Sequence, residues 1–140
     1  MARKVVVIGA GPAGYVCAIR LAQLGQQVTV VEKAYLGGTC LNVGCIPSKA
    51  LIAASALVDK LAHAGAMGIT AKSVEVDLEK LVAWKTGIVG KLTGGVKLLL
   101  EKHGAKVVLG TAQIADKQTV VVARQGGGEE RLPFDDLVIA

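Results

Sequence analysis

Apolar positions near the N-terminus fall into two short runs separated by a stretch with helical spacing. Residues 4–10 ("KVVVIGA") and 27–33 ("QVTVVEK") are dense in β-branched side chains, which is typical of strands buried in a parallel sheet. Between these runs, apolar residues recur at near-helical spacing until Gly25 ends the pattern. A strand, a helix and a strand within about 30 residues predict a right-handed parallel crossover.

Two longer helices are predicted in the middle of the chain. Residues 47–65 are rich in alanine and leucine, and residues 77–104 begin at Asp77, a suitable N-cap. Both segments end at a glycine, and together they form a long crossover to the next strand. We expect the glycines inside the second helix, at positions 87, 90, 94 and 95, to mark a bend or close packing.

The last third of the chain changes to short alternating strands. Residues 105–110 begin this part, and segments 111–115, 118–124 and 130–136 are separated by turn clusters, which predicts an antiparallel meander. Residues 136–140 ("DLVIA") read as one more buried strand. The whole pattern predicts an α/β, Rossmann-like domain with a parallel sheet, a two-helix crossover and a small antiparallel β-meander. Because no loop follows the last strand, where open α/β sheets complete their ligand sites, we expect residues 1–140 to be one truncated, incomplete domain.

Composition narrows the function classes. The 140 residues are 52% hydrophobic and 3% aromatic and include 18 glycines, which excludes disorder and favours close contacts between helices and sheet. The net charge is only +5 and the lysines are spread without interleaved aromatics, so we expect no nucleic-acid partner. We also expect no membrane partner, since no apolar stretch approaches the roughly 20 residues of a spanning helix. The absence of a secretion signal predicts a cytoplasmic protein, in which any disulfide should be one that cycles.

A dinucleotide fingerprint occupies the first predicted turn. Residues 9–14 ("GAGPAG") match GxGxxG between a strand and a helix, and Glu32 ends the second strand 21 residues after Gly11. Gly9 permits the tight turn, Gly11 lets the backbone approach a pyrophosphate, and Gly14 brings helix and strand together. The helix N-terminus attracts the phosphates, and Glu32 can accept hydrogen bonds from ribose hydroxyls. NAD and FAD both fit this pattern, whereas the acidic residue disfavours NADP.

Two cysteines stand five positions apart in "GGTCLNVGCIPSK", residues 37–49. A disulfide between Cys40 and Cys45 requires a non-helical segment between them, and Gly44 supplies the freedom for it. Closing so short a loop contributes only about 2 kcal/mol, so such a bond suits exchange with a dithiol substrate better than structural stabilisation. Zinc is disfavoured because the remaining ligand types are Cys17 and two distant histidines. Two buried free thiols remain the simpler alternative.

These two motifs together resemble the flavin disulfide reductases. The resemblance rests on "GGTCLNVGCIPSK" and "VVVIGAGPAGYVCAIRLAQLG", and it extends over the whole chain. The ending Ile46-Pro47-Ser48-Lys49 and the later "LTGGVKLLLEK" favour the branch that oxidises dihydrolipoyl groups over the glutathione reductases. It implies FAD as the cofactor, Cys40 as the thiol that exchanges with substrate, and Cys45 as the thiolate beside the flavin. Cofactor contacts implied by the resemblance are Gly9, Gly11, Pro12, Ala13, Gly14, Glu32, Lys33, Gly38, Thr39, Cys40, Lys49 and Ala112, with no metal.

The resemblance also implies parts that residues 1–140 do not contain. Family members are several times longer and carry an NAD domain, a central domain and a dimerisation domain with a His–Glu base pair. The full enzyme would be a homodimer that uses NAD⁺ as co-substrate and acts on the lipoyl domains of 2-oxo acid dehydrogenase complexes. We expect the fragment alone to be inactive. Mercuric or glutathione reductase-like activity, or a non-catalytic dinucleotide-binding module, are the alternatives.

Overall fold

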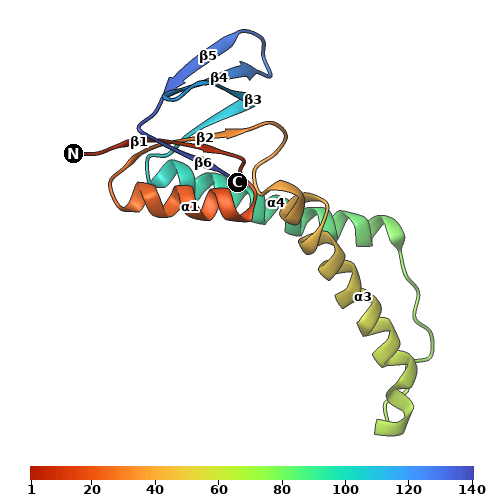
Figure 1. The fold of residues 1–140 in the computed structure, drawn as a ribbon. Coiled ribbons are helices and arrows are strands. Elements are labelled where there is room, and N and C mark those ends of the chain that lie inside the picture. The colour runs from red at the N-terminus through yellow and green to blue at the C-terminus, as the bar shows by residue number, and fades with distance from the viewer.

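The computed structural model describes all residues from 1 to 140. The elements in chain order are β1 (Lys4–Ile8), α1 (Pro12–Gln23), β2 (Gln27–Glu32), α2 (Gly38–Asn42), α3 (Cys45–His63), η1 (Ala64–Met67), α4 (Leu78–Lys102), β3 (Lys106–Asp116), β4 (Thr119–Arg124), β5 (Glu129–Pro133) and β6 (Asp136–Ile139). They form a mixed α/β fold with α1 and α4 on one side of the sheet (Figure 1).

The strands form one sheet in the order β5-β4-β3-β2-β1-β6. β1 pairs in parallel with both β2 and β6, and β2 pairs in parallel with β3. β3, β4 and β5 are joined by antiparallel pairing. The predicted parallel crossover, the antiparallel meander and the final strand are therefore all present, but the prediction that the final strand is buried was wrong, because β6 lies at the edge of the sheet with no residue fully buried.

The central parallel strands β1 and β2 are buried on both faces, which explains their unbroken apolar runs. Val5, Val7 and Val30 face a cluster with Ala18 of α1 and Leu100 of α4. The side chains that alternate with them point the other way. Val6, Val31 and Val108 pack against the meander through Val120, Val122 and Leu132. This double coverage holds the strand ends, and the turns that follow them, in fixed positions.

The third strand corrects one prediction. Segments 105–110 and 111–115 were expected as separate strands, but β3 is continuous from Lys106 to Asp116. Its first part pairs in parallel with β2 as far as Leu109, and from Gly110 onward it pairs antiparallel with β4. A Cβ at Gly110 would lie 2.4 Å from the backbone oxygen of Ala123. Glycine is therefore needed where β3 passes close to β4. At this position it allows the strand to continue and does not end it.

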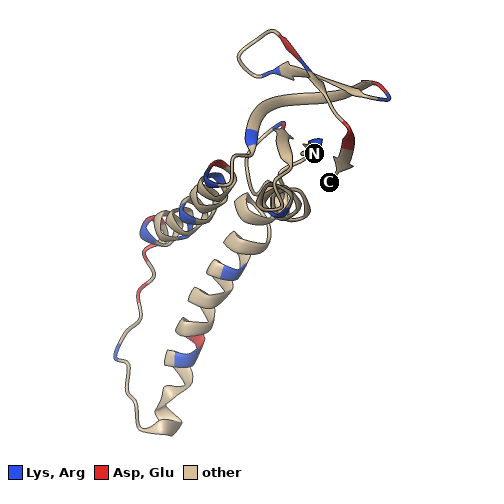
Figure 2. Cartoon of the chain, turned by 90° about the vertical axis from the view of Figure 1, so that its left-hand side faces the viewer, with Lys and Arg blue, Asp and Glu red and all other residues tan.

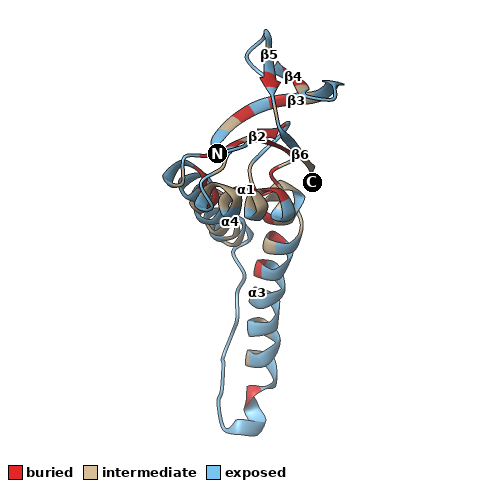
Figure 3. Ribbon diagram, turned by 60° about the vertical axis from the view of Figure 1, so that its left-hand side comes forward, coloured by how far each residue is buried: buried red, intermediate tan, exposed pale blue.

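Helix α3 extends away from the sheet, whereas α4 covers the sheet with its C-terminal half and leaves it with its N-terminal half (Figures 1 and 3). The side chain of Asp77 caps α4 by accepting a hydrogen bond from the Lys80 backbone N–H at 3.0 Å, as the sequence predicts. Exposed apolar residues on these two helices include Ile52, Leu57 and Trp84. The apolar faces of both helices are thus largely open.

The expectation that the α4 glycines mark close packing was wrong. The helix runs without interruption from Leu78 to Lys102, and a Cβ added at position 87, 90, 94 or 95 would meet no atom within 4 Å. Close packing inside this chain does not explain these glycines.

The prediction on apolar length was also wrong. The segment Gly38–Met67 is long and apolar enough, by length and composition alone, to cross a membrane, and 11% of its apolar window is buried. The segment contains scattered polar residues, so it has no long unbroken apolar run. The many alanines between them nevertheless raise its mean hydropathy.

Charged side chains are distributed along the helices and the meander with both signs present (Figure 2). Two ion pairs join strands of the sheet or the residues that flank them. Arg3 pairs with Asp136 of β6 at 2.5 Å, and Lys106 of β3 pairs with Glu130 of β5 at 2.6 Å. The positive charge is therefore not gathered into one basic surface.

Candidate functional site

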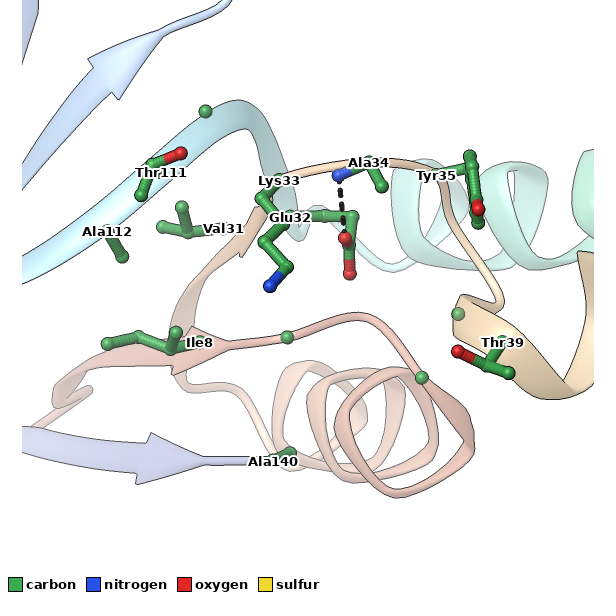
Figure 4. Close-up of a pocket in the computed structure, with 14 residues that line it drawn as sticks. Ile8, Val31, Glu32, Lys33, Ala34, Tyr35, Thr39, Thr111, Ala112 and Ala140 are labelled. Carbon is green, nitrogen blue, oxygen red and sulfur yellow. Dashed lines mark hydrogen bonds between the residues drawn. The ribbon is translucent and has the colours of Figure 1, made fainter.

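A cavity of about 580 Å³ lies at the carboxyl ends of β1 and β2, where open α/β sheets bind ligands (Figure 4). Three walls form it: the glycine turn before α1, the segment that joins β2 to α2, and the middle of β3. The lining residues are Ile8, Gly9, Gly11, Val31, Glu32, Lys33, Ala34, Tyr35, Gly38, Thr39, Gly110, Thr111, Ala112 and Ala140. The cavity is therefore built from segments far apart in the sequence.

The three fingerprint glycines occupy three different environments. Gly9 has φ +99°, and a Cβ there would lie 2.1 Å from the Ala140 backbone oxygen. A Cβ at Gly14 would lie 2.0 Å from the Gly9 oxygen, so α1 and the turn are in backbone contact. Gly11 differs because a Cβ there would meet nothing within 4 Å, although the residue lines the cavity. The space beside Gly11 is thus open to a ligand at the N-terminus of α1.

Glu32 is the one buried charged residue, with 7% of its surface exposed. One carboxylate oxygen accepts a hydrogen bond from the Ala10 N–H at 2.7 Å, and the other accepts one from the Ala34 N–H at 2.8 Å. Figure 4 shows the second bond, with Glu32 and Lys33 extending from the end of β2 toward the glycine turn. Each oxygen keeps a further lone pair, so the carboxylate can still accept from a ribose hydroxyl.

The cavity gathers seven of the predicted cofactor residues: Gly9, Gly11, Glu32, Lys33, Gly38, Thr39 and Ala112. Pro12, Ala13 and Gly14 lie in the first turn of α1 and do not line it. Cys40 and Lys49 lie outside it as well. Both sit farther along the chain, in α2 and α3, beyond the wall that Gly38 and Thr39 form.

Five lining residues were not singled out from the sequence, Ile8, Val31, Ala34, Tyr35 and Ala140, while Gly110 and Thr111 belong to the stretch that leads to the predicted Ala112. Three of them could have been found by a simple rule, because Ile8, Val31 and Ala140 lie at the carboxyl ends of parallel strands. Tyr35 gives no such signal. Its place at the cavity depends on the path of the segment between β2 and α2.

The segment that carries the cysteines is a short helix, a break and a long helix. Cys40 is in α2, Val43 and Gly44 interrupt the helical path, and Cys45 begins α3. A Cβ at Gly44 would lie 3.0 Å from the Thr39 oxygen, which leaves little room for another residue. The Asn42 side chain fixes this turn by donating to two backbone oxygens at 2.9 Å. The interruption between the cysteines lies at Val43 and Gly44.

Both thiols are free in the structure, and they interact. The hydrogen bond with the Cys45 side chain raises the pKa of the Cys40 thiol above its ordinary value, and partial desolvation and the charge of Cys45 act in the same direction. A Cys45 backbone hydrogen bond and the positive charge of Lys49 oppose the rise. This arrangement keeps the proton on Cys40 and places Lys49 within electrostatic reach of the pair.

Neither histidine stands near the cysteines. His63 ends α3, about 27 Å along the helix from Cys45, and its ring contacts the Asp59 backbone oxygen at 2.9 Å. His103 follows α4 and contacts Gln23 at the far end of α1. A base for the Cys40 thiol is not supplied by these side chains.

Fold and site together define a dinucleotide-binding domain with a pair of interacting thiols next to its cavity. Residues 3–140 match the family described as pyridine nucleotide-disulphide oxidoreductase, and the chain belongs to that family.

Two relatives with about half of their aligned residues identical show which members of this family the chain resembles. The chain is 50% identical over 137 residues to a dihydrolipoyl dehydrogenase of Geobacillus stearothermophilus, covering 98% of this chain and 29% of that protein. It is 53% identical over 135 residues to a dihydrolipoyl dehydrogenase of Bacillus subtilis, covering 96% of this chain and 28% of that protein. The chain thus spans less than a third of the length of these relatives and corresponds to the N-terminal part of such a protein.

A solved structure supports the fold. LpdA from Mycobacterium tuberculosis superposes with a TM-score of 0.89 over 99% of this chain and 31% of that one, at 23% identity. The Rossmann-like architecture, including the meander and the two-helix crossover, is therefore that of a known domain.

Proposed function

We propose that this chain is the FAD-binding part of an enzyme that oxidises dihydrolipoyl groups and reduces NAD⁺. The observation that carries the proposal is the junction of two motifs. The helix that bears Cys40 starts at the wall of the dinucleotide cavity, where a Cβ at Gly38 would lie 2.7 Å from the Gly11 Cα. A reactive sulfur pair and a dinucleotide would then occupy adjoining positions.

The residues present fit FAD. The open space at Gly11 and the N-terminus of α1 would receive the pyrophosphate, because free backbone N–H groups and the helix dipole attract anions. The remaining lone pairs of Glu32 suit ribose hydroxyls, and the backbone at Ala112, which also lines the cavity, would meet the adenine. FAD supplies a two-electron acceptor that can pass its electrons to NAD⁺.

The cysteines would carry the thiol chemistry. A substrate thiolate attacks the Cys40 sulfur of a Cys40–Cys45 disulfide, which forms a mixed disulfide and releases Cys45 as a thiolate. The second substrate thiol then displaces Cys40, so the substrate leaves as a cyclic disulfide and the protein holds both electrons as a dithiol. Lys49, within electrostatic reach, stabilises negative charge developed in this step.

Two features motivate the wider proposal for the full enzyme. The raised pKa of Cys40 calls for a base that the two histidines do not supply, so turnover would need residues beyond position 140. The exposed apolar faces of α3 and α4 suit burial against further domains or a second copy in a homodimer. The partners of the full enzyme would be the lipoyl domains of 2-oxo acid dehydrogenase complexes. The enzyme would act in the cytoplasm.

A visible spectrum and a thiol count test this function. The chain mixed with FAD and freed of excess should be yellow, and blocking thiols before and after reduction should reveal one disulfide that joins Cys40 to Cys45. A Cys17→Ala variant should keep the disulfide, whereas Cys45→Ala should lose it. A chain that binds FAD without this disulfide would instead be a non-catalytic dinucleotide-binding module.

The substrate is tested on the longer protein. Dihydrolipoamide with NAD⁺ should turn over far faster than glutathione disulfide or Hg²⁺ with a reduced nicotinamide. Preference for either of those substrates would place the enzyme in another branch of the family. The 140-residue chain should show no turnover with any of them.

A further inference from the structure

Both backbone polar groups of Ala10, which lies in the fingerprint, are hydrogen-bonded to other segments. Its N–H donates to the Glu32 carboxylate at 2.7 Å, and its C=O accepts from the Gly37 N–H at 2.8 Å. The residue itself is fully buried. The glycine turn therefore lies between the end of β2 and the residue that precedes α2.

The contact continues into the cysteine helix. Gly37 caps α2 with φ +90° and accepts from the Leu41 N–H at 3.3 Å. The next residue, Gly38, lies against Gly11. Cys40 thus stands within one turn of a helix whose start is fixed to the glycine turn by two backbone contacts.

Cys45 has attachments of its own and one to α2, because the N–H of the preceding residue, Gly44, donates to the Thr39 oxygen at 2.7 Å. It begins α3, where the Ser48 hydroxyl donates to the Gly44 backbone oxygen at 2.8 Å and Pro47 and Ala50 are buried. The relative position of the two sulfurs therefore depends on two junctions, the one between the start of α2 and the glycine turn and the one between Thr39 and Gly44.

We propose that Glu32 is a positioning residue for the cysteine pair, acting through Ala10 and Gly37. The buried carboxylate makes charge-assisted hydrogen bonds to backbone N–H groups, which are stronger than neutral ones. An amide at position 32 has one acceptor oxygen for these two N–H groups and no charge, so the Ala10 N–H loses either its acceptor or the charge assistance, and the turn that carries Gly37 and α2 loosens. The positioning role of Glu32 is additional to the ribose binding proposed for it. It rests on the proposed function, because it concerns the same two cysteines.

Amide hydrogen exchange on the cofactor-free chain tests the attachment directly. Glu32→Gln should accelerate exchange of the Ala10, Gly37 and Leu41 amides about tenfold, while the Val28 and Val30 amides of β2 stay protected. Glu32→Asp retains the charge but cannot reach both N–H groups, so its effect should be smaller. General loss of protection in β2 together with α2 would mean that the residue stabilises the fold as a whole, and the proposal would be overturned.

The sulfur pair gives the second readout. In a glutathione buffer, the protein dithiol and oxidised glutathione exchange to the protein disulfide and two reduced glutathiones. The equilibrium constant for forming the Cys40–Cys45 bond should fall about tenfold in Glu32→Gln, and less in Glu32→Asp. Asp116→Asn is the matched control, because Asp116 also accepts a backbone N–H bond, from Gln118 at 2.8 Å, at a site remote from the cysteines.

The outcomes separate the two proposals. If the wild-type chain forms the disulfide and Glu32→Gln forms it with the same equilibrium constant, the positioning role is wrong and the proposed function stands. If the wild-type chain forms no Cys40–Cys45 disulfide, the proposed function fails and the positioning role fails with it.

Discussion

Gly38 and Gly11 touch through their backbones, since a Cβ on Gly38 would lie only 2.7 Å from the Gly11 Cα. These residues belong to two motifs separated by more than twenty positions in the sequence. The contact places the helix with Cys40 at the edge of the dinucleotide cavity. It also makes the small size of Gly38 a requirement of the junction between the two motifs.

Gly38→Ala should therefore weaken both stability and FAD binding. Residue 38 has φ +58°, which is unfavourable for alanine, and the new methyl group meets backbone that cannot rotate away. We expect a loss of about 2 kcal/mol in the free energy of unfolding, measured by urea denaturation. Gly65→Ala is the control, because a Cβ there meets nothing within 4 Å and φ is not positive. Equal stability of the two variants would contradict the contact.

Gly11→Ala and Gly14→Ala should separate binding from folding. A Cβ at position 11 has free space in the protein, so unfolding should change by no more than about 0.5 kcal/mol. The same methyl group occupies the space proposed for the pyrophosphate, and FAD affinity should fall at least about tenfold, or roughly 1.4 kcal/mol. At position 14 the methyl group would overlap the Gly9 oxygen, and the chain should lose about 3 kcal/mol of stability.

Thermal melts of the cofactor-free chain and titration with FAD measure the two effects. If Gly11→Ala bound FAD as tightly as the wild type, the pyrophosphate would not lie against this turn. A Gly14→Ala chain as stable as wild type would show that α1 can move away from β1 at little cost.

Local patterns in the sequence predicted most of the fold because β1 and β2 are buried on both faces and the three long helices have clear end signals. The Asp77 cap and the glycine turns are examples of signals that act over a few residues. The continuity of β3 could not be predicted in this way. It depends on a close approach between Gly110 and Ala123, which only the folded pairing brings together.

The sequence predicted those residues of the candidate site that belong to a recognisable motif. The fingerprint and Glu32 were found from spacing, yet the two hydrogen bonds that engage the Glu32 carboxylate were not. They join residues 10, 32 and 34, and spacing carries no information about which backbone groups meet. For the same reason Tyr35 was missed as part of the cavity wall.

The α4 glycines give a prediction on stability. Gly90→Ala and Gly94→Ala should each stabilise the 140-residue chain by up to about 1 kcal/mol, because alanine favours helix and the added methyl group meets no atom. Chemical denaturation of the single variants and of their combination measures this, with Gly14→Ala as the opposite case. Destabilisation by either substitution would show that the helix is bent or packed at that position.

The pH dependence of thiol alkylation tests the electrostatics of the cysteine pair. The hydrogen bond and charge of Cys45 raise the pKa of Cys40, so the reduced wild-type chain should need a more alkaline pH than an ordinary thiol for Cys40 to react with iodoacetamide. Cys45→Ala removes the two contributions made by that side chain, and the midpoint for Cys40 should move down toward the ordinary value. Lys49→Met removes a contribution that lowers the pKa, so its midpoint should move up, by less. Peptide mass spectrometry after timed alkylation resolves Cys40 from Cys17, and a midpoint unmoved in Cys45→Ala would mean that the two sulfurs are not in contact.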